Sequence, residues 1–181
     1  CKVLWFGNNS NIKYLRSTLP ALLASTPSQR KFQFTFLATA DGLSDIKTIL
    51  SNLTTNTCWD FRFAEWNHSN QPHQLVNELN TAHITFIPSD PKDPRKSGVS
   101  HNRLTDSIQS GCIAIASPMD SYLELAKVSL IGNNFSELFS KAVVDYNRLC
   151  DKYSSLRKDF LKPFQPEYNE RSWDTAIKSI L

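Results

Sequence analysis

The hydrophobic positions of this chain follow two periods, which alternate along most of its length. Short apolar or alternating runs bounded by turn-forming residues indicate buried strands, and apolar residues three and four positions apart indicate helices that bury one face. We expect strands at residues 3–6, 32–38, 59–64, 83–87, 112–116 and 128–131. We expect helices at residues 12–23, 46–53, 75–79, 100–110 and 122–126.

Strands that alternate with helices of this length predict a parallel sheet. Each helix carries the chain back in a right-handed crossover, and successive crossovers cover both faces of the sheet. The sequence therefore predicts an α/β fold, a doubly wound and mostly parallel sheet of Rossmann-like type. Ligands of such sheets bind at the carboxyl ends of the strands, so the loops that follow the strands hold the candidate site residues.

The last third of the chain is helical. One apolar stripe predicts a helix that contains Phe139, Ala142, Val143, Tyr146, Leu149 and Cys150. Pro163 and Pro166 interrupt the helical pattern before a last helix at residues 167–181, because proline cannot donate the backbone hydrogen bond of a helix interior. We expect a Rossmann-like domain over residues 1–164 and a C-terminal helical segment over residues 165–181.

Length and composition fit one such domain. The chain has 181 residues and a formal net charge of +3, too small a charge to indicate nucleic-acid binding. The four cysteines are scattered, without a partner at metal-ligand spacing, which predicts unpaired, buried thiols in a reducing compartment, the cytoplasm. No apolar run suggests a membrane span, and no signal peptide is evident. The chain starts at Cys1 instead of Met, which suggests a piece of a larger protein.

Positive charge is concentrated before one predicted helix. Residues 92–103 carry four basic side chains against one acid, so this segment has the same net charge as the whole chain. Ser100 can cap the helix that follows, and Gly111 can end it. The unpaired N–H groups and the dipole of a helix N-terminus attract anions, so Lys96 and Arg103 beside it predict a phosphate site. A solvated charged loop is the alternative.

Two motifs around this helix, Lys96-Ser-x-x-Ser-x-Asn-Arg-Leu and Ser110-Gly-x-x-x-x-Ala-Ser117, resemble those of the C-terminal half of GT-B glycosyltransferases. The resemblance covers nearly the whole chain. It implies a domain that binds a nucleoside-diphosphate sugar, without a metal or another cofactor. It also implies that a separate N-terminal domain of the same protein completes the site, and that the last helix, with Trp173, crosses toward that domain.

The resemblance assigns roles to the residues of the basic helix. Lys96 and Arg103 would be the catalytic counter-charges of the diphosphate, and the backbone N–H groups of Ser100, His101 and Asn102 would be further donors.

The resemblance also assigns residues to the nucleoside. Asp106 matches the second acid of the E-x7-E motif of retaining enzymes and would bind the ribose, while Gly98 stands at the position of the first acid. Glu65 and Trp66 lie in the region that receives the base. The implied function is donor binding for a retaining sugar transfer that this chain alone does not catalyse.

Structural roles are the alternatives for single residues. Asp106 could act only on the helix dipole, Trp66 could belong to the core, and His101 could be a surface residue.

Two other function classes remain open. A flavodoxin-like or response-regulator-like module that binds a flavin or a protein partner would need a phosphate-binding loop or an acidic pair after the first strand, where residues 7–10 read Gly-Asn-Asn-Ser. A dinucleotide-dependent oxidoreductase would need a GxGxxG turn, which the sequence lacks.

Overall fold

The computed structural model describes residues 1–24, 26, 30–53, 58–67, 69, 71–96, 98–165 and 167–168. Its centre is a six-stranded sheet in the order β3-β2-β1-β4-β5-β6, in which all neighbouring strands are parallel. The strands are β1 (Lys2–Phe6), β2 (Phe32–Ala38), β3 (Trp59–Glu65), β4 (Ile84–Ile87), β5 (Ile113–Ala116) and β6 (Leu130–Ile131). This is the strand order of Rossmann dinucleotide-binding domains, and it confirms the predicted doubly wound α/β fold.

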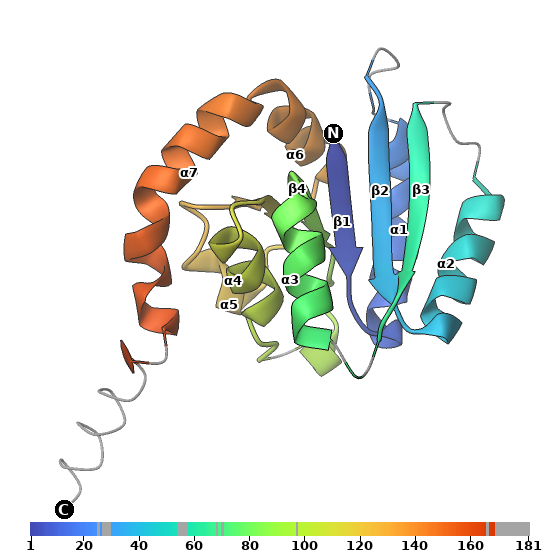
Figure 1. Ribbon diagram of the computed structural model, residues 1–181, viewed down its shortest axis with the longest axis horizontal. Helices are drawn as coiled ribbons and strands as arrows, with labels where there is room; N and C mark the ends of the chain where they lie inside the picture. Colours follow the sequence, from blue (N-terminus) through green and yellow to red (C-terminus); the bar gives the residue numbers. More distant parts are fainter. Residues whose placement is uncertain are drawn as a thin grey trace, which may run out of the picture.

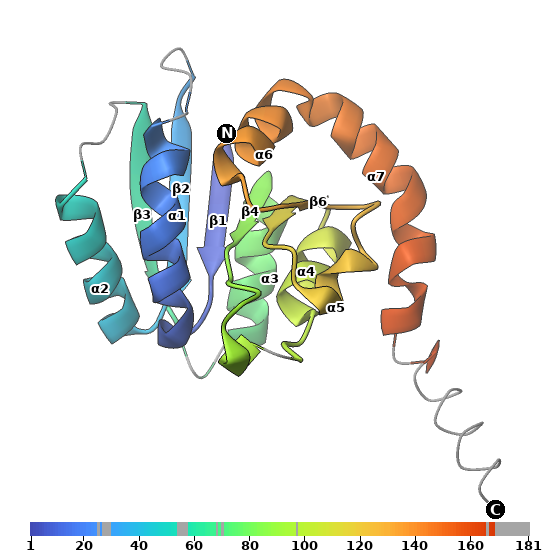
Figure 2. The same ribbon diagram turned by 180° about the vertical axis from the view of Figure 1, so that it is seen from behind.

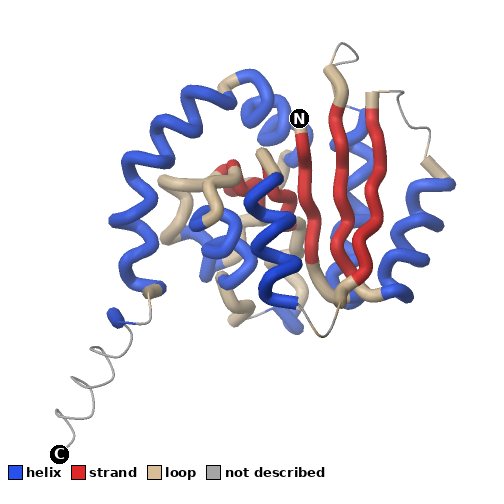
Figure 3. Tube along the Cα trace, viewed as in Figure 1, coloured by secondary structure: helices blue, strands red, loops and turns tan. Residues whose placement is uncertain are grey.

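Helices cover both faces of the sheet, as Figures 1, 2 and 3 show. The helices are α1 (Ile12–Ala24), α2 (Ala40–Ser51), α3 (Gln71–Thr81), α4 (Asn102–Gln109), α5 (Asp120–Leu123), α6 (Phe135–Val144) and α7 (Tyr146–Leu161). Three 3-10 turns are η1 (Asn9–Asn11), η2 (Pro94–Lys96) and η3 (Lys162–Phe164). Helix α3 lies in front of the sheet in Figure 1, and α1 lies in front of it in Figure 2, so these two helices cover opposite faces.

Aromatic side chains of β2 and β3 fill the core on the α1 side. Phe32, Phe34 and Phe36 alternate along β2 and are almost fully buried. The rings of Phe34 and Phe36 stack with centroids 4.4 Å apart, and Trp59 lies 4.9 Å from the ring of Phe32. Offset and tilted rings at these distances stabilise a core beyond the area that they bury. These ring contacts therefore join β2 to β3 on this side of the sheet.

The structure corrects the prediction of one helix along the stripe from Phe139 to Cys150. That stripe belongs to two helices, α6 and α7, which are separated at Asp145. The Asp145 carboxylate accepts a hydrogen bond from Arg148 at 2.6 Å, within the first turn of α7. The chain changes direction here, and α7 curves around the β6 side of the sheet (Figure 1).

Two further expectations concern the cysteines and the C-terminal helix. Cys58 and Cys112 are buried, Cys150 is half-buried, and none of the four is in a disulfide, but Cys1 is exposed, which corrects its expected burial. The expected helix over residues 167–181, with Trp173, lies outside the described residues apart from 167 and 168.

Among the described helices, none is long and apolar enough to cross a membrane.

Candidate functional site

The candidate site lies where the carboxyl ends of β1 and β4 meet. Strand β1 pairs with both β2 and β4, and the helix that follows β1 covers the opposite face from α4, which follows β4 (Figures 1 and 2). The two connections therefore separate at this point, and such a switch point is the usual ligand crevice of a doubly wound sheet. The loop after β1 begins at Gly7, and the loop after β4 carries Lys96 at the end of η2.

Lys96 is held inside this switch point. Its Nζ donates a hydrogen bond to Oδ1 of Asn11 at 2.7 Å and lies 5.5 Å from the centre of the Tyr14 ring. Burial lowers the pKa of Lys96, and the positive charge of Arg103 lowers it further. None of the ion pairs found among the described residues includes Lys96 or Arg103. The ammonium therefore has no carboxylate in direct contact within the described residues, and the charge of Asp93 acts on it only from a distance.

Arg103 reaches the same place from the first turn of α4. Its Nη1 lies 3.5 Å from the carbonyl oxygen of Phe6, a long hydrogen bond. A Cβ on Gly7 would lie 3.4 Å from this Nη1, 3.3 Å from Cζ2 of Trp5 and 3.4 Å from Nδ2 of Asn11. Because residue 7 has no side chain, these three groups converge on its backbone. The structure thus brings Lys96 and Arg103 together at the end of β1.

Asn11 is a site residue that the sequence analysis missed. The residue is only 8% exposed, and its Oδ1 accepts a hydrogen bond from Lys96, so the amide nitrogen is left as a donor beside Gly7. The contact joins residues 85 positions apart, and its place in a turn after a strand is its only sequence signal. The site therefore offers an ammonium, a guanidinium and an amide.

Asp93 of the same loop pairs with two nearby cations, Lys13 and Arg95, but not with Lys96. Its carboxylate accepts hydrogen bonds from Arg95 at 3.0 and 3.1 Å and from the Tyr14 hydroxyl at 2.6 Å, and it also pairs with Lys13. The Arg95 guanidinium, followed by Lys13, holds the pKa of the Asp93 carboxyl well below its usual range. Asp93 therefore fastens the loop to α1 and pairs with Lys13 and Arg95, whereas Lys96 is bonded to Asn11 instead of a carboxylate.

We expect an Asp93→Asn variant to unfold at a lower urea concentration than the wild type at pH 7. The depressed pKa of Asp93 means that its stabilisation is present above the carboxyl's unfolded-state pKa of about 3.9 and fades as the pH falls below it. The difference between the two proteins should therefore shrink from pH 4 toward pH 2. Urea unfolding followed by circular dichroism at several pH values measures it, and a difference that does not change with pH would contradict this role.

Ser117 of the second motif fastens the start of the same loop. Its Oγ donates to the carbonyl oxygen of Ser89 at 2.6 Å and lies 2.7 Å from the Ser89 N–H, which donates to it. Gly111 ends α4 with a φ of +89°, a conformation that glycine adopts without strain. The motif Ser110-Gly-x-x-x-x-Ala-Ser117 therefore has a structural role beside the site.

The start of α4 differs from the sequence expectation by two residues. The helix begins at Asn102, with His101 at the capping position. The Oγ of Ser100 accepts the N–H of Asn102 at 3.2 Å, so this backbone donor is already occupied. The His101 ring lies 4.4 Å from the ring of Phe164 and faces the C-terminal segment. The structure therefore directs His101 and Asn102 toward the C-terminal segment and the groove beside α7, and the Asn102 N–H is not available to an anion.

Asp106 lies one turn after Arg103 on α4 and lines two grooves whose lining residues include neither Lys96 nor Arg103. It borders a groove of about 450 Å³ with Arg157 of α7 and a groove of about 470 Å³ with Val76 of α3. Burial raises the pKa of Asp106. Within the described residues, no hydrogen bond or ion pair joins it to Lys96 or Arg103.

Glu65 and Trp66 lie at the end of β3, the edge strand beyond β2. Glu65 is exposed, and Trp66 is half-buried against the apolar cluster that includes Leu4 and Phe6. The side-chain amide of Gln74 donates to the Glu65 carbonyl oxygen at 2.8 Å and fixes this loop to α3. Trp66 is therefore partly a core residue, as the structural alternative expected, and two strands separate its loop from β4.

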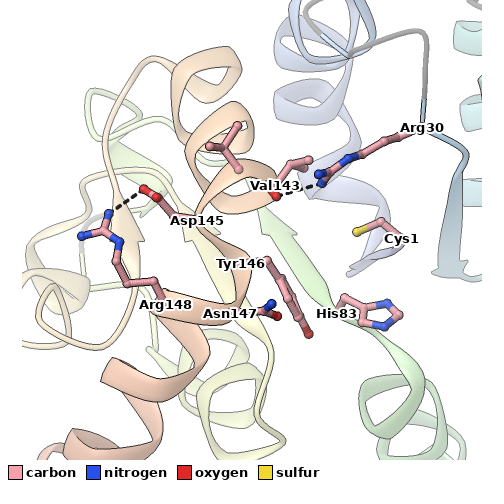
Figure 4. Close-up of a pocket in the computed structure, with 9 residues that line it drawn as sticks. Cys1, Arg30, His83, Val143, Asp145, Tyr146, Asn147 and Arg148 are labelled. Carbon is pink, nitrogen blue, oxygen red and sulfur yellow. Dashed lines mark hydrogen bonds and ion pairs between the residues drawn. The ribbon is translucent and has the colours of Figure 1, made fainter.

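A cavity lies at the opposite ends of the strands, beside the residues that precede β1 and β4 (Figure 4). It measures about 550 Å³ and is bordered by Cys1, His83 and Tyr146. Its charged groups are engaged: Arg30 donates to the Val143 carbonyl at 3.0 Å, and Arg148 pairs with Asp145. His83 accepts the N–H of Lys2 at Nδ1, and burial lowers its pKa. Because the cations of this cavity already have partners, the carboxyl ends of β1 and β4 are the better candidate for an anion site.

The described residues contain no group of three or more His, Cys, Asp or Glu that could hold a metal ion. The donors at the candidate site are nitrogen atoms of Lys96, Arg103 and Asn11, and such a set suits an anion.

Comparisons with known proteins agree with this architecture. The sequence matches no protein-family model and no curated protein. Among solved structures, the catalytic domain of cholesterol-alpha-glucosyltransferase from Helicobacter pylori is similar, with a TM-score of 0.57, 15% identity, and coverage of 88% of this chain and 97% of that chain. WaaG, a glycosyltransferase involved in lipopolysaccharide biosynthesis, is also similar, with a TM-score of 0.62 and 14% identity; the match covers 96% of this chain and 46% of WaaG. The chain therefore has the Rossmann-like fold of a GT-B glycosyltransferase domain.

Proposed function

We propose that this chain is the donor-binding domain of a glycosyltransferase and binds a nucleoside-diphosphate sugar between the ends of β1 and β4. One observation carries the proposal: Arg103 lies beside Gly7, Lys96 is bonded to Asn11 next to the same glycine, and neither cation forms an ion pair within the described residues. Two neighbouring cations repel each other, and burial of the ammonium raises the free energy of its charged form. A bound diphosphate would relieve both effects.

The same groups suit the chemistry of sugar transfer. When the bond between the sugar and the diphosphate breaks, negative charge grows on the departing diphosphate. A guanidinium can donate two parallel hydrogen bonds to phosphate oxygens, and an ammonium adds a point charge. Groups that are already in place before the reaction stabilise this developing charge without reorganisation. In this proposal Lys96 and Arg103 are catalytic through charge stabilisation, and the Asn11 amide orients Lys96.

The nucleoside part of the donor is assigned from the family resemblance. Asp106 is the proposed ribose ligand, and Glu65 and Trp66 border the proposed base site. We also propose a retaining outcome and an acceptor site on another domain. The match to about half of the WaaG chain supports that division.

The observed topology argues against a flavodoxin-like or response-regulator-like module. Such modules have the strand order 2-1-3-4-5, whereas this sheet has the order β3-β2-β1-β4-β5-β6. The connection after β1 contains three asparagines and the η1 turn, without an acidic pair.

Titration of the protein with UDP, GDP, ADP and FMN by isothermal calorimetry tests the proposal. We expect one nucleoside diphosphate to bind, its monophosphate to bind at least about tenfold more weakly because one charged contact is lost, and FMN not to bind. Binding of FMN without binding of any nucleoside diphosphate would contradict the proposal and favour the flavin-binding alternative.

A further inference from the structure

A small hollow lies at the far edge of the sheet from β3, beside β6. Helices α6 and α7 arch around this edge strand (Figure 2). The hollow measures about 280 Å³, and Leu130 of β6, Leu138 of α6 and Leu149 of α7 provide its apolar lining. It is smaller than a pocket for a drug-sized ligand, which usually exceeds about 300 Å³. Its size suits a small group instead of a whole nucleotide sugar.

Three cations border this hollow: Lys141, Arg148 and Lys152. No carboxylate is among its lining residues. Arg148 pairs with Asp145 at 2.6 Å, but Lys141 and Lys152 belong to none of the ion pairs formed within the described part of the chain. The hollow therefore carries a positive charge that an anion could balance.

Tyr153 adds a neutral donor to these charges. The residue is only 5% exposed and also lines the hollow. Its hydroxyl makes no hydrogen bond within the described residues and is not one of their fully buried polar atoms without a partner, so the hydroxyl oxygen is accessible from the hollow or from solvent. Burial raises the pKa of Tyr153 to about 12, and the nearby Arg148 opposes this rise. The phenol is therefore protonated at neutral pH and can donate a hydrogen bond to a ligand oxygen.

We propose that this hollow binds the phosphoryl group of a small phosphate ester. The two unpaired ammonium groups and the hydroxyl of Tyr153 provide charge and donors for the phosphate oxygens, and Arg148, which stays paired with Asp145, borders the same hollow. The leucine side chains accept the organic part of the ester. The ester could be a soluble metabolite or the headgroup of an anionic phospholipid, because the two share this chemistry. The site lies at the β6 edge and does not depend on the proposed donor site at Gly7.

Titration with glycerol 3-phosphate, followed by the amide signals of the 15N-labelled chain, tests this site. We expect saturable shifts at residues 130–131 and 148–153. The Lys141→Gln, Lys152→Gln double variant should bind at least about tenfold more weakly, which corresponds to about 1.4 kcal/mol. Tyr153→Phe should also weaken binding, by about fivefold, without lowering the urea midpoint, because it removes a hydroxyl without a hydrogen-bond partner. Lys158→Gln removes a charge from another face of α7 and is the matched control.

Sedimentation with vesicles separates the two sources of the phosphate. For a lipid headgroup, vesicles of phosphatidylglycerol and phosphatidylcholine should bind the wild type but not the double variant, and pure phosphatidylcholine should bind neither. For a soluble ester, glycerol 3-phosphate shifts the same amides while neither vesicle binds. The site is overturned if the double variant and the wild type respond equally to both probes, if the shifts occur only around Lys96, or if neither probe binds.

Discussion

The Arg103→Gln variant is expected to bind the preferred nucleoside diphosphate about 10–100-fold more weakly than the wild type. Loss of a charged hydrogen-bond partner removes about 1.5–3 kcal/mol, and each 1.4 kcal/mol is a factor of about ten. Lys96→Gln should have an effect of similar size. The double variant should lose less than the product of the two factors, because the two charges repel each other in the unliganded site and either substitution relieves this repulsion.

Lys31→Gln is the matched control for this pair of variants. Lys31 is exposed and directly precedes β2. It therefore lies at the opposite end of the strands from Gly7, and the substitution removes a charge far from the proposed site. Its affinity for the nucleotide should stay within about twofold of the wild type, because exposed distant charges are screened by salt. Calorimetry at two salt concentrations gives the affinities of the wild type and of the four variants. Equal affinity in Arg103→Gln, Lys96→Gln and Lys31→Gln would remove the proposed diphosphate site.

The Phe34→Ala variant should lose about 3–5 kcal/mol of unfolding free energy, the usual range for a buried phenylalanine that leaves a cavity. Phe34 is fully buried and its ring contacts those of Phe36, Trp59 and Phe86. Phe61→Ala, on the edge strand and only half-buried, should lose clearly less. Urea unfolding monitored by circular dichroism compares the two. Equal losses would show that the core is not centred on β2.

Most of the fold could be predicted because each strand and helix has its own periodic pattern. Alternation at Phe32, Phe34 and Phe36 marked β2 directly, and the helical spacing after Ile12 outweighed Pro20, which the structure places inside α1. The break between α6 and α7 was not predictable in this way. The spacing of Val143 and Tyr146 fits one continuous helix, and a single residue at Asp145 changes the direction of the chain.

The candidate site could be predicted only as far as its local pattern. Lys96 and Arg103 stand beside one helix start, so the sequence places them near each other. The contacts of Asn11 with Lys96 and of Asp93 with Tyr14 join segments about 80 residues apart, and they depend on how β1 and β4 pair. His101 turns toward Phe164 for the same reason, since only the tertiary fold brings η3 to the start of α4.

The most direct test of the donor site is a map of amide shifts when the preferred nucleoside diphosphate is added to the 15N-labelled chain. The site beside Gly7 and the cavity beside His83 lie at opposite ends of the strands, so one experiment distinguishes between them. We expect the largest shifts at Gly7, Asn11, Lys96 and Arg103. The largest shifts at His83 and Tyr146 would place the nucleotide in the amino-terminal cavity and contradict the account.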